Sequence, residues 1–141
     1  MSGISGRTVL RLFYFFLPAV LFAGIIFAIS SLSYVSVPKL GIHFEDKLLH
    51  ALEYFIFGFL LVRALYFGKP NSVPVKLLYF AVFIGLLYGA SDEFHQYFVP
   101  GRTCEFWDWL ADAIGVVSGS FVYRQLHALE SQVIQLAKKT L

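Results

Sequence analysis

The feature that most constrains this chain is a series of four apolar stretches, each about as long as a membrane-spanning helix. A helix crosses the hydrocarbon core of a bilayer with about 20 apolar residues. The four stretches cover residues 9–31, 47–67, 75–97 and 106–123. We therefore predict an all-α fold, a polytopic membrane bundle of four transmembrane helices that forms one domain over residues 1–141.

The composition agrees with a membrane protein. The chain is 58% hydrophobic and only 14% charged, whereas a soluble domain carries about 25% charged residues. The net charge of +2 is too small to indicate a nucleic-acid partner. We expect the lipid bilayer to be the main environment of the chain and expect no binding of nucleic acid.

The first apolar stretch has a second interpretation as a cleaved signal peptide. Arg7 and Arg11 precede or begin it, and Ala28 and Ser30 have the spacing of a cleavage site. The stretch is long for the apolar region of a signal peptide, which favours a membrane span. Pro18 lies within the stretch and is expected to kink the helix.

The end of the chain is predicted to form a separate, short amphipathic helix over residues 126–141. Two lysines near its end favour contact with anionic lipid, and we expect this helix to lie on the cytoplasmic membrane surface. Its apolar residues recur at helical spacing, at Leu126, Leu129, Val133, Leu136 and Ala137.

The distribution of basic residues predicts the orientation, because cytoplasmic loops carry an excess of Lys and Arg. The two termini and the loop between the second and third spans hold most of them, so we predict that both termini are cytoplasmic. The other two loops hold Lys39, Lys47 and Arg102. The cytoplasmic set is Arg7, Arg11, Arg63, Lys69, Lys76, Arg124, Lys138 and Lys139.

This orientation places three polar clusters at the same outer face. They stand at the start of the second span, at the end of the third and at the start of the fourth. Ionisable groups at a membrane span are costly unless they are paired, and they commonly mark a functional site. The clusters are Asp46, Lys47, His50 and Tyr54; Glu93, Gln96 and Arg102; and Asp108 and Asp112.

Small residues on the third and fourth spans favour close packing of these helices. Gly85 and Gly89, and likewise Gly115 and Gly119, have the small-xxx-small spacing that lets helix backbones approach each other. A tight bundle of this kind could bring the three polar clusters together.

Such a set of side chains is suited to proton transfer and to anion binding. The candidate catalytic residues are His50 or Glu93 as a general base and Arg102 as a bidentate clamp for a phosphate or carboxylate. We expect no resident metal or cofactor. A divalent metal held by His50, His95 and nearby carboxylates is a less favoured alternative, because the two histidines have no fixed ligand spacing. The candidate substrate-binding residues are Asp46, Lys47, Tyr54, Gln96, Asp108 and Asp112.

The same residues also have structural interpretations. Asp46 and Asp108 could cap the helices that they begin. Arg102 could pair with Asp108 or Glu93 at the outer rim, and Tyr54 could be an interfacial aromatic residue. His50, Glu93 and Asp112 are harder to explain in this way, because each lies inside a predicted span.

The three motifs, taken together, resemble the signature of the VanZ-like membrane proteins. The matching segments are Asp46-Lys-Leu-Leu-His-Ala-Leu-Glu-Tyr54, Ser91-Asp-Glu-Phe-His-Gln96 with Pro100-Gly-Arg102, and Asp108 to Asp112-Ala-Ile-Gly115. The resemblance covers about residues 46–119. In members of this family the position of Asp112 is often Asn, and here Asp adds an ionisable group.

The resemblance implies a small, multi-pass protein of the bacterial cytoplasmic (inner) membrane. The namesake of the family is associated with low-level teicoplanin resistance, which membership alone does not imply for this chain. We expect a cell-envelope protein that binds an envelope component, or alters antibiotic access to it, at the outer membrane–water face. The alternative is a membrane-embedded enzyme that acts on a lipid-linked or phosphate-bearing substrate outside the cytoplasm. A lipid intermediate or a partner membrane protein is the expected ligand.

Overall fold

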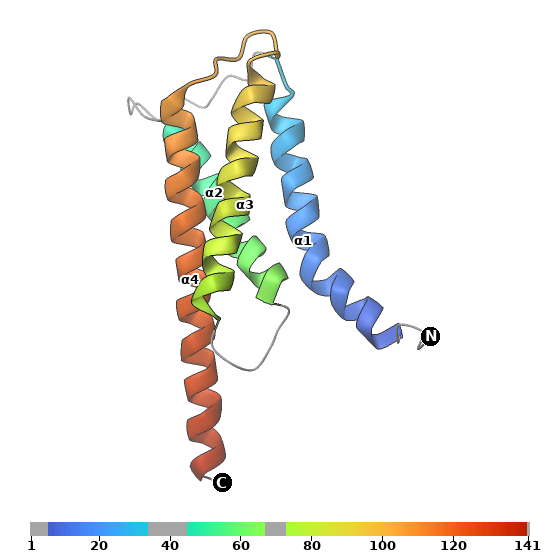
Figure 1. The fold of residues 1–141 in the computed structure, drawn as a ribbon, viewed down its shortest axis with the longest axis vertical. Helices are drawn as coiled ribbons and strands as arrows, with labels where there is room; N and C mark the ends of the chain where they lie inside the picture. The colour runs from blue at the N-terminus through green and yellow to red at the C-terminus, as the bar shows by residue number, and fades with distance from the viewer. Residues whose placement is uncertain (1–5, 34–44, 67–72, 141) are drawn as a thin grey trace.

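The computed structural model describes residues 6–33, 45–66 and 73–140 (Figure 1). Within these ranges the protein is wholly helical and contains no strand. Four helices account for nearly all of the described residues. They are α1 (Gly6–Ser30), α2 (Glu45–Tyr66), α3 (Val75–Gln96) and α4 (Phe106–Thr140).

The first three helices have nearly the predicted bounds, and each is long and apolar enough to cross a membrane. These three are the only helices in the described part of the chain that meet this condition. Three of the four predicted spans thus correspond to helices that could cross a membrane, and the fourth predicted span is not confirmed. The segments that join the first, second and third predicted spans lie largely outside the described residues.

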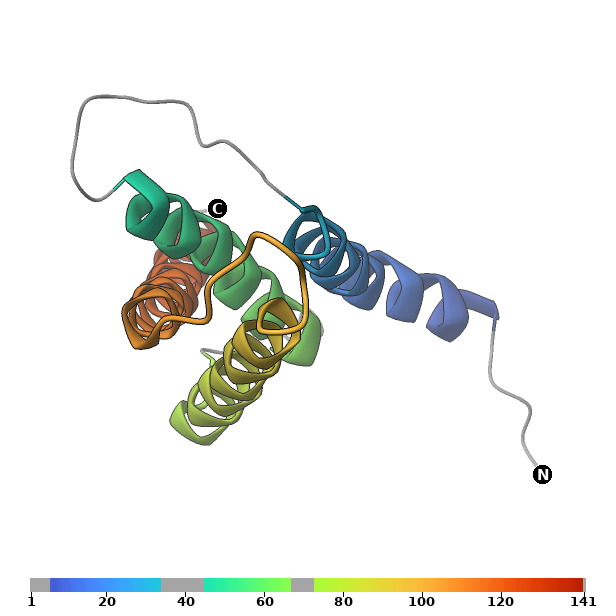
Figure 2. The ribbon, with the colours of Figure 1, turned by 90° about the horizontal axis from the view of Figure 1, so that it is seen from above.

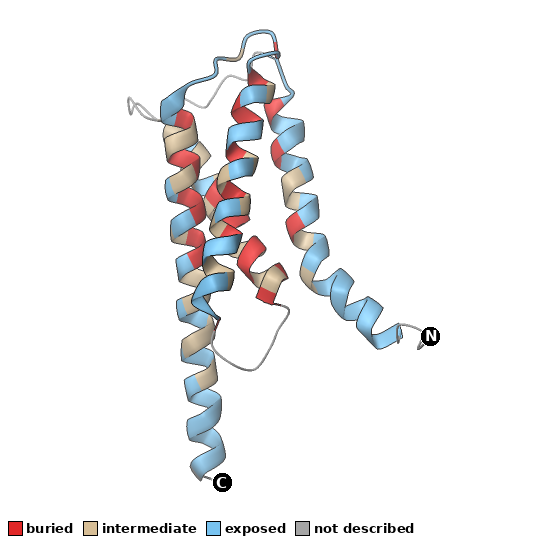
Figure 3. Ribbon diagram, viewed as in Figure 1, coloured by how far each residue is buried: buried red, intermediate tan, exposed pale blue. Residues whose placement is uncertain are grey.

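The separate C-terminal helix predicted over residues 126–141 is not confirmed. The structure instead continues α4 from Phe106 without a break to Thr140. The reason is local, because the sequence between residues 120 and 140 contains neither glycine nor proline, the residues that most readily end a helix. Most of this extension is exposed, as the pale blue end of α4 in Figure 3 shows.

The centre of the fold is the pairing of α2 with α4, which make the most extensive contact of any two helices. Glycines let the two backbones touch. A Cβ atom added to Gly115 would overlap the carbonyl oxygen of Ala51, and one added to Gly119 would overlap that of Phe55. On the other helix, Gly58 faces the backbone of Val116 in the same way. The close approach that the sequence predicted for Gly115 and Gly119 is thus present.

The third helix, α3, packs against this pair through its own glycines. Gly85 faces the side chain of Val116, and Gly89 lies against Asp112 and Tyr54. The first helix, α1, stands to one side of the other three (Figure 2). Its N-terminal half diverges from the bundle, whereas its C-terminal end lies beside the end of α3 (Figure 1).

The distribution of buried side chains follows from the packing of the four helices. The buried side chains lie where helices face one another, and large apolar side chains cover the outer surface of the bundle (Figure 3). Leu10, Phe13, Tyr79 and Leu87 are examples, each more than half exposed. An apolar outer surface of this extent fits contact with lipid rather than water.

The glycine contacts generate a stability prediction for Gly119→Ala. The new methyl group would overlap the Phe55 backbone, so the helices must separate, and overpacking of this kind costs about 1–3 kcal/mol. We expect a lower midpoint of thermal unfolding in detergent. The matched control is Gly24→Ala on α1, where an added Cβ meets nothing within 4 Å; equal midpoints for the two variants would contradict the packing described.

Candidate functional site

The acidic residues of the protein gather at one end of the bundle. Eight of its nine carboxylates stand there, on the first half of α2, the last turns of α3, the loop that follows, and the first turns of α4 (Figure 1). The exception is Glu130 in the extension of α4. The three clusters predicted to share one face therefore do so. The buried members are Asp92, Glu93, Gln96, Asp108 and Asp112.

A histidine–aspartate pair joins α2 to α4 at the centre of this end. The Nδ1 atom of His50 lies 2.9 Å from Oδ1 of Asp112, and their side chains are 15% and 1% exposed. Because a carboxylate only accepts hydrogen bonds, His50 donates its Nδ1–H to Asp112, and in the neutral imidazole Nε2 then carries the lone pair. The glycine contact at Gly115, just beyond Asp112 on α4, sets this separation. The second carboxylate oxygen of Asp112, Oδ2, is buried and has no hydrogen-bond partner.

Glu93 approaches the pair from α3. Its Oε2 accepts a hydrogen bond from the backbone N–H of Glu105 at 3.0 Å, while its Oε1 is buried without a hydrogen-bond partner. One potential ligand atom from each of His50, Glu93 and Asp112 lies within 4.8 Å of the other two. We call these three residues the His50–Glu93–Asp112 set.

The arrangement of this set suits proton transfer. A histidine whose Nδ1–H is held by a buried carboxylate has a fixed tautomer and a fixed ring orientation. Its other nitrogen can accept a proton, and the carboxylate stabilises the imidazolium that results. Glu93 adds a second proton carrier within the same small volume.

Lys47 forms a second centre, closer to the start of α2 than His50 is. Its Nζ lies 2.6 Å from Asp108, 2.7 Å from Asp46 and 2.9 Å from Glu105. The Asp108 side chain is only 8% exposed, whereas those of Asp46 and Glu105 are nearly half exposed. The hydrogen bond from Lys47 lowers the pKa of Glu105 below its ordinary value. This ammonium group ties the start of α2 to α4 and to the loop before it.

A third polar group connects α3 to α1. Ser30 donates a hydrogen bond to Oδ2 of Asp92 at 2.8 Å, and Gln96 donates to the same oxygen at 3.1 Å. Beside it, His95 shares a 2.9 Å hydrogen bond with Ser31 and stacks on the ring of Phe27. Gln96 and His95, which the sequence analysis considered as ligands, are thus turned toward α1.

Arg102 is also turned toward α1. Its Nη2 donates to the carbonyl of Ile29 at 2.8 Å and its Nε to that of Leu32 at 3.2 Å. These carbonyls belong to the end of α1, where backbone acceptors lack helical partners. Arg102 follows a turn in which Gly101 has a φ of 82°, a backbone conformation that favours glycine. This turn directs the chain at Arg102 toward α1. The guanidinium therefore caps a helix, whereas the sequence suggested an anion clamp.

Tyr54 is fully buried between the helices rather than at the interface. Its ring packs against those of Phe57 and Tyr88, and its hydroxyl has no hydrogen-bond partner. Gly89 separates it from Asp112, and a Cβ added there would lie 3.4 Å from both side chains. Tyr54 thus lies next to the His50–Glu93–Asp112 set.

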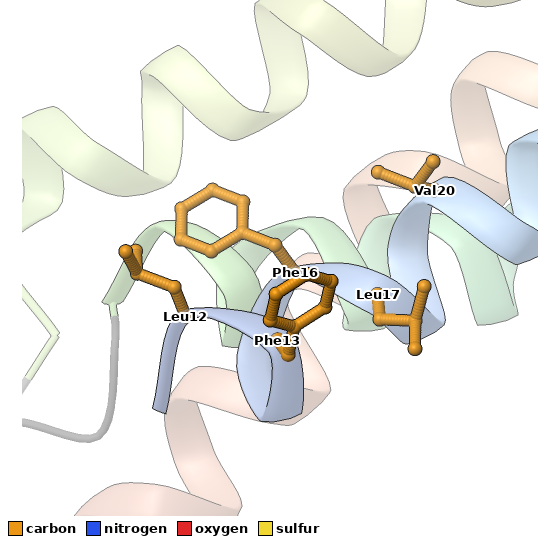
Figure 4. Close-up of a pocket in the computed structure, with 5 residues that line it drawn as sticks. All are labelled: Leu12, Phe13, Phe16, Leu17 and Val20. Atoms are coloured by element: carbon orange, nitrogen blue, oxygen red, sulfur yellow. The ribbon is translucent and has the colours of Figure 1, made fainter. Parts of the chain in front are cut away.

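Two surface pockets differ in their relation to these residues. One lies along α1 and is lined by apolar side chains alone, far along the helix from the polar end (Figure 4). The other, of about 400 Å³, lies on the α2–α4 surface beside the Lys47 cluster, which consists of Lys47 and its partners Asp46, Glu105 and Asp108. Its lining residues are Lys47, Trp107, Leu110, Ala111 and Ile114.

Sequence reasoning missed the contributions of Ser30 and Glu105. Ser30 ends an apolar helix, and a polar residue at that position was a usable signal. Glu105 stands just before α4, but nothing in its spacing indicates that its backbone would reach Glu93. Asp92 lies within the motif from Ser91 to Gln96, but it was not among the candidate site residues.

Fold and site together define a class: a small helical membrane protein with a buried, ionisable site at one end of its bundle. A family model described as VanZ/LLP1 matches residues 7–128. The chain therefore belongs to the VanZ/LLP1 family, as the three motifs indicated, and is a VanZ-like membrane protein. Comparisons with curated proteins and with solved structures found no match.

The Lys47 cluster generates a second stability prediction. Lys47→Met leaves the buried Asp108 carboxylate without its cation, which costs about 3 kcal/mol, the lower end of the range for broken buried pairs because Lys47 is partly exposed. We expect a lower unfolding midpoint in detergent, and partial recovery in the double variant Lys47→Met/Asp108→Asn.

The control is Glu105→Gln, which removes a half-exposed partner of the same lysine and is expected to cost at most about 1 kcal/mol. If adding Asp108→Asn to Lys47→Met lowered the midpoint further, the interpretation as a charge cluster would be wrong.

Proposed function

We propose that this VanZ-like protein binds the polar head group of a cell-envelope lipid at the outer face of the bacterial cytoplasmic membrane and acts on it as an enzyme. The observation that carries the proposal is the His50–Glu93–Asp112 set. It places an oriented imidazole beside two buried carboxylate oxygens that lack hydrogen-bond partners. Buried polar atoms without partners are costly, and they are tolerated mainly where they serve a function.

The orientation follows from the separation of charge along the bundle. The basic residues of the described chain other than Lys47 and Arg102 lie at the end opposite the carboxylates. Under the rule that cytoplasmic segments are positive, that end is cytoplasmic and the set faces outward. This arrangement uses the first part of α4, residues 106–123, as a fourth span. The opposite end holds Arg7, Arg11, Arg63, Lys76, Arg124, Lys138 and Lys139.

The pocket beside Lys47 supports a lipid as the substrate. Its walls are apolar apart from Lys47. In a bundle of four spans, the α2–α4 surface on which it opens would be in contact with lipid. A hydrocarbon chain in this pocket would bring its head group to the level of Lys47 and Asp108. Asp112 lies one helical turn further along α4, so the head group would be near the set.

In the proposed reaction, His50 acts as the general base. Its Nε2 accepts the proton of a water or hydroxyl nucleophile, and Asp112 stabilises the imidazolium through the Nδ1–H hydrogen bond. The nucleophile oxygen bonds to the phosphorus or carbonyl carbon of a head-group ester, and the bond from that atom to the leaving oxygen breaks. Protonated Glu93 gives its proton to the leaving oxygen, which departs as an alcohol.

The test follows the lipid directly. Purified protein in nanodiscs made from a bacterial envelope lipid extract is incubated, and the lipid species are followed by mass spectrometry. We expect wild-type protein to convert one class of lipid, and Glu93→Gln to slow this conversion by about 100-fold or more, because general acid–base groups contribute about 10²–10⁴ in rate. The matched control, Glu130→Gln, changes the same side chain on the exposed extension and should leave the rate unchanged.

The competing interpretation is a non-catalytic protein that binds an envelope component and changes antibiotic access to it. It predicts that every lipid species stays unchanged, and that tolerance to a teicoplanin-type antibiotic falls in proportion to the amount of folded protein. If the Glu93→Gln variant converted lipid as fast as wild type, the enzymatic proposal would also be wrong.

A further inference from the structure

The His50–Glu93–Asp112 set has the composition of a metal site. It offers one imidazole nitrogen and two carboxylate oxygens, a mixed donor set that suits divalent first-row ions such as Mn²⁺ and Zn²⁺. The donors come from three different helices: α2, α3 and α4. From this geometry we infer that the set binds one divalent cation between these three helices.

The spacing of the donors fits a cation of this size. One ligand atom from each residue lies within 4.8 Å of the other two. An ion bonded at about 2.0–2.2 Å holds its ligands about 3.3–3.6 Å apart in a tetrahedral site. The widest separation among the three ligand atoms would therefore have to close by roughly 1–1.5 Å.

Unpaired oxygens point to the same conclusion. Glu93 and Asp112 are 5% and 1% exposed, and each has one carboxylate oxygen, Oε1 and Oδ2, that is buried without a hydrogen-bond partner. The other oxygen of each is held, by the Glu105 N–H and by His50. Each carboxylate is thus fixed on one side and left with a free acceptor on the other, which a cation would satisfy.

The charge balance at this end of the bundle also calls for a cation. At this end, the described part of the chain holds eight carboxylates and only two side chains with a permanent positive charge, Lys47 and Arg102. Lys47 is engaged by three carboxylates, and Arg102 by carbonyls of α1. Neither of them neutralises Glu93 or Asp112. A divalent ion would supply the missing positive charge.

This cation deepens the proposed function, and its role in a reaction rests on that function. An anionic head group is repelled by an acidic site, and a divalent ion removes the repulsion. Three protein ligands leave coordination positions open, as in catalytic rather than structural metal sites. If Nε2 of His50 binds the ion and Nδ1 stays on Asp112, His50 is a ligand and no longer the general base, so the ion would activate the nucleophile in its place. A phosphate or carboxylate oxygen of the lipid could occupy one of the open positions.

The inference is tested by measuring bound metal on tag-free protein in nanodiscs. The protein is stripped with a chelator and dialysed against Mn²⁺ or Zn²⁺, and the metal per chain is determined by mass spectrometry. We expect one ion per chain, and an affinity at least about tenfold lower in Glu93→Gln and Asp112→Asn. The control, Asp92→Asn, neutralises a neighbouring buried carboxylate on α3 and should retain the ion.

A spectroscopic measurement on wild-type protein covers the case in which a variant fails to fold. Pulsed electron paramagnetic resonance of the Mn²⁺-loaded protein should show coupling to one imidazole nitrogen. Absence of a stoichiometric ion, or equal affinity in wild type and both variants, would overturn the inference.

The two proposals fail in different ways. If lipid conversion depends on Glu93 but persists in excess chelator, the cation site is wrong and the enzymatic function stands. If the ion binds as described and no lipid is converted, the cation site stands and the enzymatic function is wrong.

Discussion

The contact on which the rest of the structure depends is the direct touching of the α2 and α4 backbones. In a membrane, helices gain little from the hydrophobic effect and associate through close packing and polar contacts. Gly58, Gly115 and Gly119 remove the side chains that would keep the two helices apart. With the helices at this separation, His50 reaches Asp112 and Lys47 reaches Asp108. The polar site is thus a consequence of packing between apolar helices.

Two kinds of polar contact share this end of the bundle. Lys47 and Arg102 have their donors engaged, by carboxylates and by the carbonyls that end α1. Such contacts hold helix ends in place. The His50–Glu93–Asp112 set differs, since two of its oxygens have no partner. Asp92, which links α3 to α1 through Oδ2, likewise has a buried Oδ1 without a hydrogen-bond partner. The set is therefore distinguished by the meeting of potential ligand atoms from three helices, together with its unpaired oxygens.

Much of this could be predicted from the sequence because membrane helices have strong periodic and length signals. The bounds of α1, α2 and α3, the glycine contacts and the gathering of three motifs at one end all followed from apolar length, charge and helical spacing. His50 and Asp112 were identified because ionisable residues within an apolar span are expensive.

Other features depend on rotation of helices about their axes, which spacing does not determine. Glu93 and Gln96 are neighbours on α3, yet Glu93 faces α4 and Gln96 faces α1. Arg102 follows a turn whose direction is set by Gly101. The hydrogen-bond partners of Arg102 could therefore not be predicted from its place in the sequence. The extension of α4 was misjudged for a different reason: its amphipathic pattern indicated a helix but not whether that helix was continuous with the span before it.

That continuity has a mechanical consequence. A helix of 35 residues is about 52 Å long, which exceeds the hydrocarbon thickness of a bilayer by about 20 Å. Since α4 also carries Asp108 and Asp112, the exposed rod and the buried polar site are parts of one rigid body. A torque or push applied to the far end of α4 would be transmitted along the helix to the residues that face α2 and α3.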